Sequence, residues 1–167
     1  LCRSLEFIIP GPVETLVRVE EVMGADGAID LKFTVTALEN GVQADLRGLF
    51  WDVGDESLLP GMEVVEADSP HVTDSAFAAN DVVDLGQGAN MRGRITNKGR
   101  GFDAGVEIGT PGQSRDDIDT TSFVVTAAEG VDLTLDAIGD MRFGVRYTSV
   151  GPEGARAESI TLDLVGL

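Results

Sequence analysis

Basic residues are scarce in this sequence. Its 167 residues include 12 Lys and Arg against 29 Asp and Glu, which gives a formal net charge of −17. A surface with this charge repels nucleic-acid phosphates and anionic lipid headgroups. We therefore expect no nucleic-acid partner. The expected partners are cations such as calcium, cationic surfaces, neutral molecules such as polysaccharides, or another surface protein.

Cysteine, histidine and long apolar runs are also scarce. The lone Cys2 cannot form an internal disulfide, and the lone His71 excludes a metal site built from several histidines. No apolar run approaches the roughly 18 residues that a membrane-spanning helix needs, so we expect no membrane insertion. The sequence shows no initiating methionine and no signal peptide. We expect residues 1–167 to form one domain of a longer protein.

Aromatic residues are few, with one Trp, one Tyr and seven Phe. A sugar-binding surface needs exposed aromatic planes beside polar groups. Trp51 lies on an apolar strand face and Tyr147 alternates with apolar residues, so we expect both in the core. The buried Tyr147 hydroxyl would then need a hydrogen-bond partner.

Glycine and alternating apolar residues are abundant. The 21 Gly and six Pro separate short segments in which apolar and polar residues alternate with period two, as in β-strands. These segments are residues 13–20, 29–37, 45–53, 102–108, 122–126, 141–148 and 159–164. The pattern predicts an all-β fold, a two-sheet antiparallel sandwich that is jelly-roll-like and has eight to ten strands.

The segment of residues 45–53 is apolar on both faces, which predicts a central strand. We expect Leu49, Trp51 and Val53 on one face, and Leu46 and Phe50 on the other. Asn40-Gly41, just before this segment, is a turn signal typical of hairpins. Residues 58–63 or 74–79 are candidates for a short helical turn.

The most distinctive segment is FDAGVEIGTPGQSRDDIDTTSF, residues 102–123. Asp103 and Glu107 share the polar face of one strand, and three more Asp residues follow the turn at Pro111-Gly112. Crowded carboxylates repel each other unless a cation neutralises them, and Ca²⁺ takes six to eight oxygen ligands. We predict a calcium site formed by Asp103, Glu107, Asp116, Asp117 and Asp119. The alternative is a solvated loop whose Asp residues cap turns.

Other candidates for chemistry are weaker. Asp52, Asp55 and Glu56 form a second acidic group. We expect Asp55 to cap a short turn through its side chain rather than to bind an ion. His71 lies in a Ser-Pro-His turn, which indicates a surface residue rather than a catalytic base. Two carboxylates can hydrolyse a glycosidic bond, but with 29 acidic residues such pairs arise by chance. We expect no enzyme.

Four runs of the sequence resemble a domain found in large bacterial exported proteins. The runs are LRGLFWDVGDESLL, DVVDLGQGANMRG, FDAGVEIGTPGQSRDDIDTTSFVV and MRFGVRYTSVG, in that order between residues 45 and 151. The domain often accompanies hemolysin-type (RTX) calcium-binding repeats or surface-sorting tails. The resemblance implies export and calcium-rich surroundings, and it assigns no functional residue.

These observations favour a non-catalytic module of a secreted or surface-attached bacterial protein, either extracellular or on the cell surface. It would act in adhesion, matrix assembly or ligand binding, with calcium stabilising a loop. The first alternative is a carbohydrate-binding module of a polysaccharide-acting enzyme, and a weaker one is a carboxylate-based glycoside hydrolase. The basic residues Arg92, Arg94, Lys98 and Arg100 either dock an acidic partner or neutralise the protein's own acidic patch across the sandwich.

Overall fold

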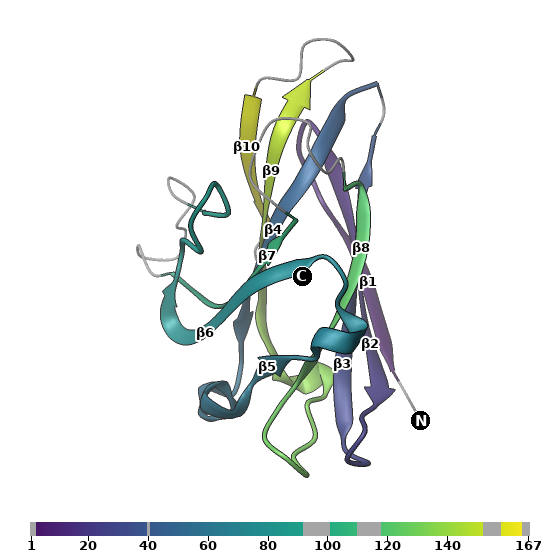
Figure 1. Cartoon of the computed structure of the whole chain (residues 1–167), viewed down its shortest axis with the longest axis vertical. Helices are drawn as coiled ribbons and strands as arrows, with labels where there is room; N and C mark the ends of the chain where they lie inside the picture. Colours follow the sequence, from purple (N-terminus) through teal and green to yellow (C-terminus); the bar gives the residue numbers. More distant parts are fainter. Residues whose placement is uncertain (1–2, 40, 92–100, 110–117, 152–157, 165–167) are drawn as a thin grey trace.

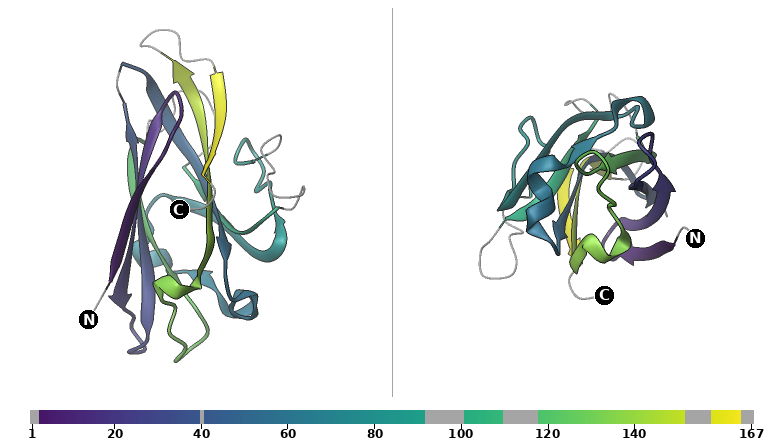
Figure 2. Two further views of the ribbon diagram at one scale, coloured as in Figure 1. Left: turned by 180° about the vertical axis from the view of Figure 1, so that it is seen from behind. Right: turned by 90° about the horizontal axis from the view of Figure 1, so that it is seen from below.

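Two antiparallel β-sheets pack face to face (Figure 1), and further views show the two layers from behind and from below (Figure 2). The computed structural model describes residues 3–39, 41–91, 101–109, 118–151 and 158–164. Sheet A has the strand order β1 (Ser4–Ile9), β2 (Glu14–Met23), β3 (Ile29–Leu38), β8 (Thr120–Thr126) and β5 (Glu63–Val64). Sheet B has the order β10 (Glu158–Leu164), β9 (Ile138–Gly151), β4 (Gln43–Val53), β7 (Phe102–Ile108) and β6 (Val72–Val82). The expected all-β sandwich is confirmed, and the number of strands in the described ranges, ten, agrees with the expected eight to ten.

The hairpin of β2 and β3 shows how alternation builds these sheets. Val17 and Val19 of β2 lie opposite Val35 and Phe33 of β3, and all four side chains are buried. The residues between them point away from the core, as the period of two requires. The turn that joins the strands includes Gly27 at a φ of 83°, a conformation that glycine adopts without steric cost.

The turn signal Asn40-Gly41 does not close a hairpin. Gly41 has a φ of 80°, and Asn40 lies outside the described residues. However, β3 belongs to sheet A and β4 to sheet B, so the chain crosses between the sheets here. The expected hairpin is wrong because β4, apolar on both faces, lies at the centre of sheet B between β9 and β7. Similar crossings join β7 to β8 and β8 to β9, as in Greek-key and jelly-roll sandwiches.

A bulge in β4 changes which of its residues face the core. The register with β9 shifts between Leu46 and Gly48. Leu46 therefore joins Leu49 and Trp51 in the main core, while Phe50 lies in a smaller cluster elsewhere. The prediction that Leu46 and Phe50 share a face is wrong, because one extra residue in a strand reverses the alternation beyond it.

Short 3₁₀ turns connect several strands. They are η1 (Glu56–Gly61), η2 (Glu66–Asp68) and η3 (Leu135–Ala137). Asp55 caps η1 as expected, because its Oδ1 accepts a hydrogen bond of 3.1 Å from the Ser57 backbone N–H. Residues 74–79, the other expected helical turn, form part of β6 instead. Within the described ranges, no helix is long and apolar enough to cross a membrane.

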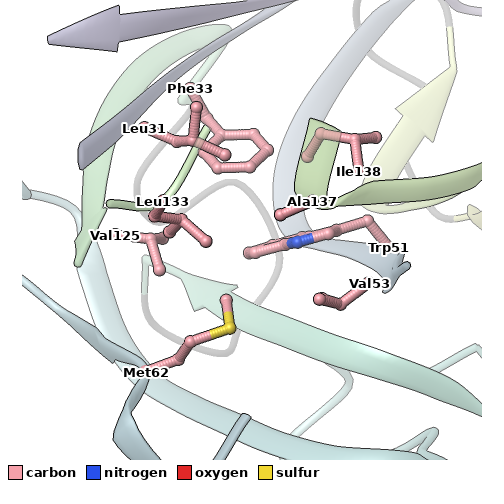
Figure 3. A pocket seen from close by; sticks show the side chains of 9 residues that line it. All are labelled: Leu31, Phe33, Trp51, Val53, Met62, Val125, Leu133, Ala137 and Ile138. Carbon is pink, nitrogen blue, oxygen red and sulfur yellow. The ribbon is translucent and has the colours of Figure 1, made fainter. Parts of the chain in front are cut away.

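Aromatic rings fill the space between the sheets. Trp51 is 1% exposed, and its ring centroid lies 4.6 Å from that of Phe33 and 5.9 Å from that of Phe123. Figure 3 shows Trp51 beside a hollow whose other walls are Leu31, Phe33, Val53, Met62, Val125, Leu133, Ala137 and Ile138. This hollow has no space for a water-sized molecule, so it is packed core. The expected core position of Trp51 is confirmed.

Tyr147 joins the two sheets through its hydroxyl group. Its side chain is fully buried in β9, and its Oη lies 2.7 Å from Oγ1 of Thr15 in β2. Thr15 is fully buried as well. The expected burial of Tyr147, with a partner for its hydroxyl, is confirmed.

Tyr147→Phe removes one partner of this hydrogen bond and leaves the Thr15 hydroxyl buried alone. We expect the free energy of unfolding, measured in urea, to fall by about 1–2 kcal/mol. The double variant Tyr147→Phe with Thr15→Val removes both polar groups and should recover most of that loss. A single variant as stable as the wild type would contradict the role of this bond.

Glu21 of β2 binds Arg3, which precedes β1, and the first residue of η3. Its carboxylate accepts hydrogen bonds from Arg3 Nη2 at 2.9 Å, the Arg3 backbone N–H at 3.1 Å and the Leu135 backbone N–H at 3.0 Å. The Arg3 side chain contributes most to lowering the pKa of Glu21 to about 2. The ionised carboxylate is therefore the form that stabilises the fold.

A carboxyl group whose pKa is lowered on folding stabilises above its ordinary pKa, and that contribution disappears as the pH falls to the folded value. Glu21→Gln should therefore be less stable than the wild type at pH 6, and the difference should shrink steadily from about pH 4.5 toward pH 2. Urea unfolding of both proteins across this range measures the difference. A constant difference would show that the charge of Glu21 contributes nothing.

Candidate functional site

The five predicted calcium ligands do not all lie in the described structure. Asp116 and Asp117 lie outside the described residues, and Asp119 is exposed just before β8. Asp103 and Glu107 are buried in β7, at 3% and 8% exposure. The expected polar face of this strand is therefore covered, and its two acids have partners within the fold.

Asp103 connects β7 to the strands on either side of it. Its Oδ2 accepts a hydrogen bond of 2.8 Å from the Val53 backbone N–H at the end of β4. Its Oδ1 accepts one of 2.8 Å from the Asn80 backbone N–H in β6. Asn80 has a φ of 57° within an irregular stretch of β6, so the carboxylate supports a strained piece of backbone. These contacts give Asp103 a structural role.

Glu107 forms a buried ion pair with Arg47 of β4. Its Oε2 lies 2.7 Å from Arg47 Nη2, and its Oε1 accepts a hydrogen bond of 2.6 Å from Thr73 Oγ1. Arg47 also donates to the carbonyl oxygens of Ile108 and Gly109 through Nη1, and to that of Gln87 through Nη2. The pair therefore joins β4, β6 and β7 to the segment of residues 83–91.

That segment forms part of a cover over the outer face of sheet B. Met91 packs with Phe50, Val82 and Phe102 in a second apolar cluster, separate from the main core. The guanidinium of Arg142 in β9 lies 4.0 Å from the centroid of the Phe102 ring, and Arg142 is 2% exposed. Charged and apolar side chains are thus buried together on this face.

Calcium binding by the five acids stays a prediction. Both oxygens of Asp103 and of Glu107 already accept hydrogen bonds, which they would have to give up to bind an ion. Among the residues that the structure describes, no three Asp, Glu, His or Cys side chains are placed to hold one metal ion. His71, as expected, is exposed in a turn, where its Nδ1 lies 2.9 Å from Thr121 Oγ1.

A different acidic site lies on the outer face of sheet A. A pocket of about 240 Å³ opens where the β2–β3 turn, the end of β8 and η2 meet. In Figure 1, η2 is the short turn between β5 and β6, and it contacts β8. We call this hollow the acidic pocket; its lining is Val22, Met23, Gly24, Ala25, Asp26, Asp30, Val65, Asp68, Val124 and Thr126.

Asp30 is the buried acid of this pocket. It lies at the start of β3 opposite Val22 of β2, and it is 5% exposed. Its Oδ1 is buried and has no hydrogen-bond partner among the residues that the structure describes. Its Oδ2 lies against Gly24, where a Cβ atom would come within 2.5 Å of it. A glycine at this point of the turn therefore leaves room for the Asp30 carboxylate.

The other two acids of the pocket differ from Asp30. Asp26 accepts hydrogen bonds from the backbone N–H groups of Gly130, at 2.7 Å, and Ala28, at 3.0 Å. These bonds, that from Gly130 foremost, lower the pKa of Asp26 and keep it anionic at neutral pH. Asp68 is exposed in η2. The pocket therefore combines a fixed anion, an exposed acid and a buried carboxylate with an unpartnered oxygen.

Sequence reasoning missed this site. The alternation of residues 29–37 places Asp30 on the polar face of a strand and gives it no further role, and Asp26 and Asp68 belong to no motif. The three acids come from two turns and a strand, and packing alone brings them together. The local sequence offers one signal: Asp26 stands directly before Gly27 in a turn, and a second acid, Asp30, follows at the start of the next strand.

Glu107→Gln tests the structural role assigned to the buried ion pair. The variant leaves Arg47 buried with carbonyl partners and no counter-charge, so the free energy of unfolding should fall by about 3 kcal/mol. Glu14→Gln, at an exposed position in β2, is the matched control and should change stability by less than about 0.5 kcal/mol. Equal stability of the two variants would contradict the role of the pair.

Comparisons with other proteins give no relative for this chain. No family model, no curated protein and no solved structure matches it. We therefore infer its function from the side chains that the fold brings together.

Proposed function

We propose that this chain is a non-catalytic binding module of an exported bacterial protein, and that it acts in adhesion, matrix assembly or ligand binding. The observation that carries the proposal is the acidic pocket, a hollow on a sheet face that contains a buried carboxylate oxygen without a partner. Ligand sites are concave, and a few placed polar groups give them specificity. The net charge of −17 makes cationic ligands the favoured class.

The resemblance to domains of exported proteins supports a location outside the cell or on its surface. Those domains often stand beside hemolysin-type calcium-binding repeats, so their surroundings are rich in calcium. A strongly acidic sandwich suits this environment, because divalent cations reduce the repulsion among its carboxylates. The proposal therefore includes calcium as a stabilising ion.

The aromatic side chains do not favour the sugar-binding alternative. The structure describes all nine aromatic residues of the chain, and eight of them are buried: Phe7, Phe33, Phe50, Trp51, Phe102, Phe123, Phe143 and Tyr147. Phe77 is half-buried and packs its edge against Trp51. None of these rings is available as an open platform on which a sugar could stack.

The acids of sheet B do not favour the hydrolase alternative either. Glycoside hydrolysis needs one carboxyl group that donates a proton and a second that attacks the sugar or activates water. Asp103 and Glu107 use both oxygens of each carboxylate in hydrogen bonds within the fold. Turnover of nitrophenyl glycosides by the purified protein would contradict the non-catalytic proposal.

Thermal unfolding tests the calcium part of the proposal. We expect 5 mM CaCl₂ to raise the melting temperature by roughly 5–10 °C over EGTA at matched ionic strength, because an ion that binds the folded state at about 100 times its Kd adds about 2.7 kcal/mol. Magnesium at the same concentration controls for general charge screening. Equal melting temperatures in calcium and EGTA would overturn calcium stabilisation.

Two sets of variants locate the ion. We take Asp116, Asp117 and Asp119 as the ligands to test, because Asp103 and Glu107 already use both carboxylate oxygens within the fold. The triple variant Asp116→Asn, Asp117→Asn and Asp119→Asn should lose the calcium response. Glu107→Gln should melt at a lower temperature with and without calcium, while keeping the difference between the two conditions. A calcium response that survives in the triple variant would contradict this choice of ligands.

A further inference from the structure

The acidic pocket has apolar walls as well as acids. Val22 and Met23 of β2, Val65 before η2 and Val124 of β8 contribute aliphatic side chains to its lining. Met23 is 68% exposed, the largest exposed fraction among the big apolar residues of the described chain. A ligand in this pocket would therefore contact hydrocarbon over part of its surface and carboxylates over the rest.

Asp30 differs from the other buried acids. Glu21 pairs with Arg3, Glu107 pairs with Arg47, and Asp103 accepts two backbone hydrogen bonds. Asp45 accepts a hydrogen bond of 3.0 Å from the Ile118 backbone N–H. Asp30 is as buried as these residues, yet among the described residues no hydrogen bond or ion pair reaches its carboxylate. A buried carboxylate without a partner is costly, so its retention points to a partner that comes from outside the chain.

The size and composition of the pocket indicate the kind of partner. At about 30 Å³ per water molecule, 240 Å³ equals the volume of about eight waters, far more than one ion fills. No three metal-binding side chains are placed around one point in the described chain. An alkylammonium group needs fewer charged ligands than a metal ion. One carboxylate can neutralise its charge while apolar side chains pack along its methylene stem.

We propose that the acidic pocket binds an alkylammonium group, as found in a lysine side chain or a free primary amine. The ammonium donates a hydrogen bond to the Asp30 carboxylate, and Asp68 and Asp26 add negative charge around it. Its methylene stem packs against Val22, Val65 and Val124. This inference rests on the proposed function in one respect, since it names the ligand of the binding module.

Isothermal titration calorimetry with n-pentylamine at pH 7 tests the proposal. The wild-type protein should bind it one to one, and 1-pentanol and ammonium chloride, which carry the stem or the charge alone, should bind at least tenfold more weakly. Asp30→Asn keeps the shape of the side chain and removes its charge. This variant should weaken pentylamine binding by about tenfold or more, as loss of a charged hydrogen-bond partner does.

Asp81→Asn is the matched control, because it makes the same charge change at an exposed position of β6 in the other sheet. It should bind pentylamine like the wild type. Equal binding by Asp30→Asn and Asp81→Asn would overturn the proposal. Displacement of pentylamine by an equal concentration of calcium would also overturn the proposal, because the pocket would then be an ion site.

Amide chemical shifts of the wild-type protein give a test that needs no variant. Pentylamine should shift the amides of residues 22–30, 65–68 and 124–126, and shifts confined to other residues would overturn the proposal. Nα-acetyl-lysine methylamide in place of pentylamine distinguishes a lysine side chain from a free amine as the source. If pentylamine binds but calcium leaves the melting temperature unchanged, only the calcium proposal is contradicted. If calcium raises the melting temperature but pentylamine does not bind, only the alkylammonium proposal is contradicted.

Discussion

The desolvation of charge is the constraint that organises both faces of this sandwich. Moving a charged side chain out of water costs several kcal/mol unless hydrogen bonds or an opposite charge replace the lost water. Sheet B meets this constraint on its outer face, where Arg47 and Glu107 pair beneath the segment of residues 83–91. The central strand β4 can therefore be buried on both sides, with Trp51 in the main core and Arg47 under the cover. The main core and the second cluster depend on the same strand.

The same constraint separates structural acids from candidate functional ones. The most conspicuous acids of the sequence, Asp103 and Glu107, serve the fold, because each carboxylate oxygen accepts a hydrogen bond from a neighbouring strand. Asp30 is buried to a similar degree on the opposite sheet, and within the described part of the chain its Oδ1 has no hydrogen-bond partner. Proteins commonly accept such a cost at sites where a ligand removes it. Acid density in the sequence is therefore a poorer guide to a binding site than the hydrogen-bonding state of each carboxylate.

Alternation of apolar residues predicted most of the fold. The strand faces of β2, β3 and β9, the central place of β4, and the burial of Trp51 and Tyr147 all follow from period-two patterns that the core enforces. The bulge at Leu46 and the crossing at Gly41 did not follow, because pairing with distant strands decides both. The acidic pocket could not be predicted from the sequence for the same reason. Asp26, Asp30 and Asp68 become neighbours only when η2 packs beside β8, and nothing in the spacing of these residues encodes that contact.

The central claim is that the fold holds the Asp30 carboxylate without a partner of its own. The free energy of unfolding of Asp30→Asn in the absence of any amine or divalent ion tests this claim most directly. Removing an unpaired buried charge and keeping its shape should raise the stability, by about 1–3 kcal/mol in urea unfolding at pH 7. A fall in stability of the size expected for Glu107→Gln would contradict the account, because it would show that Asp30 already has a partner within the fold.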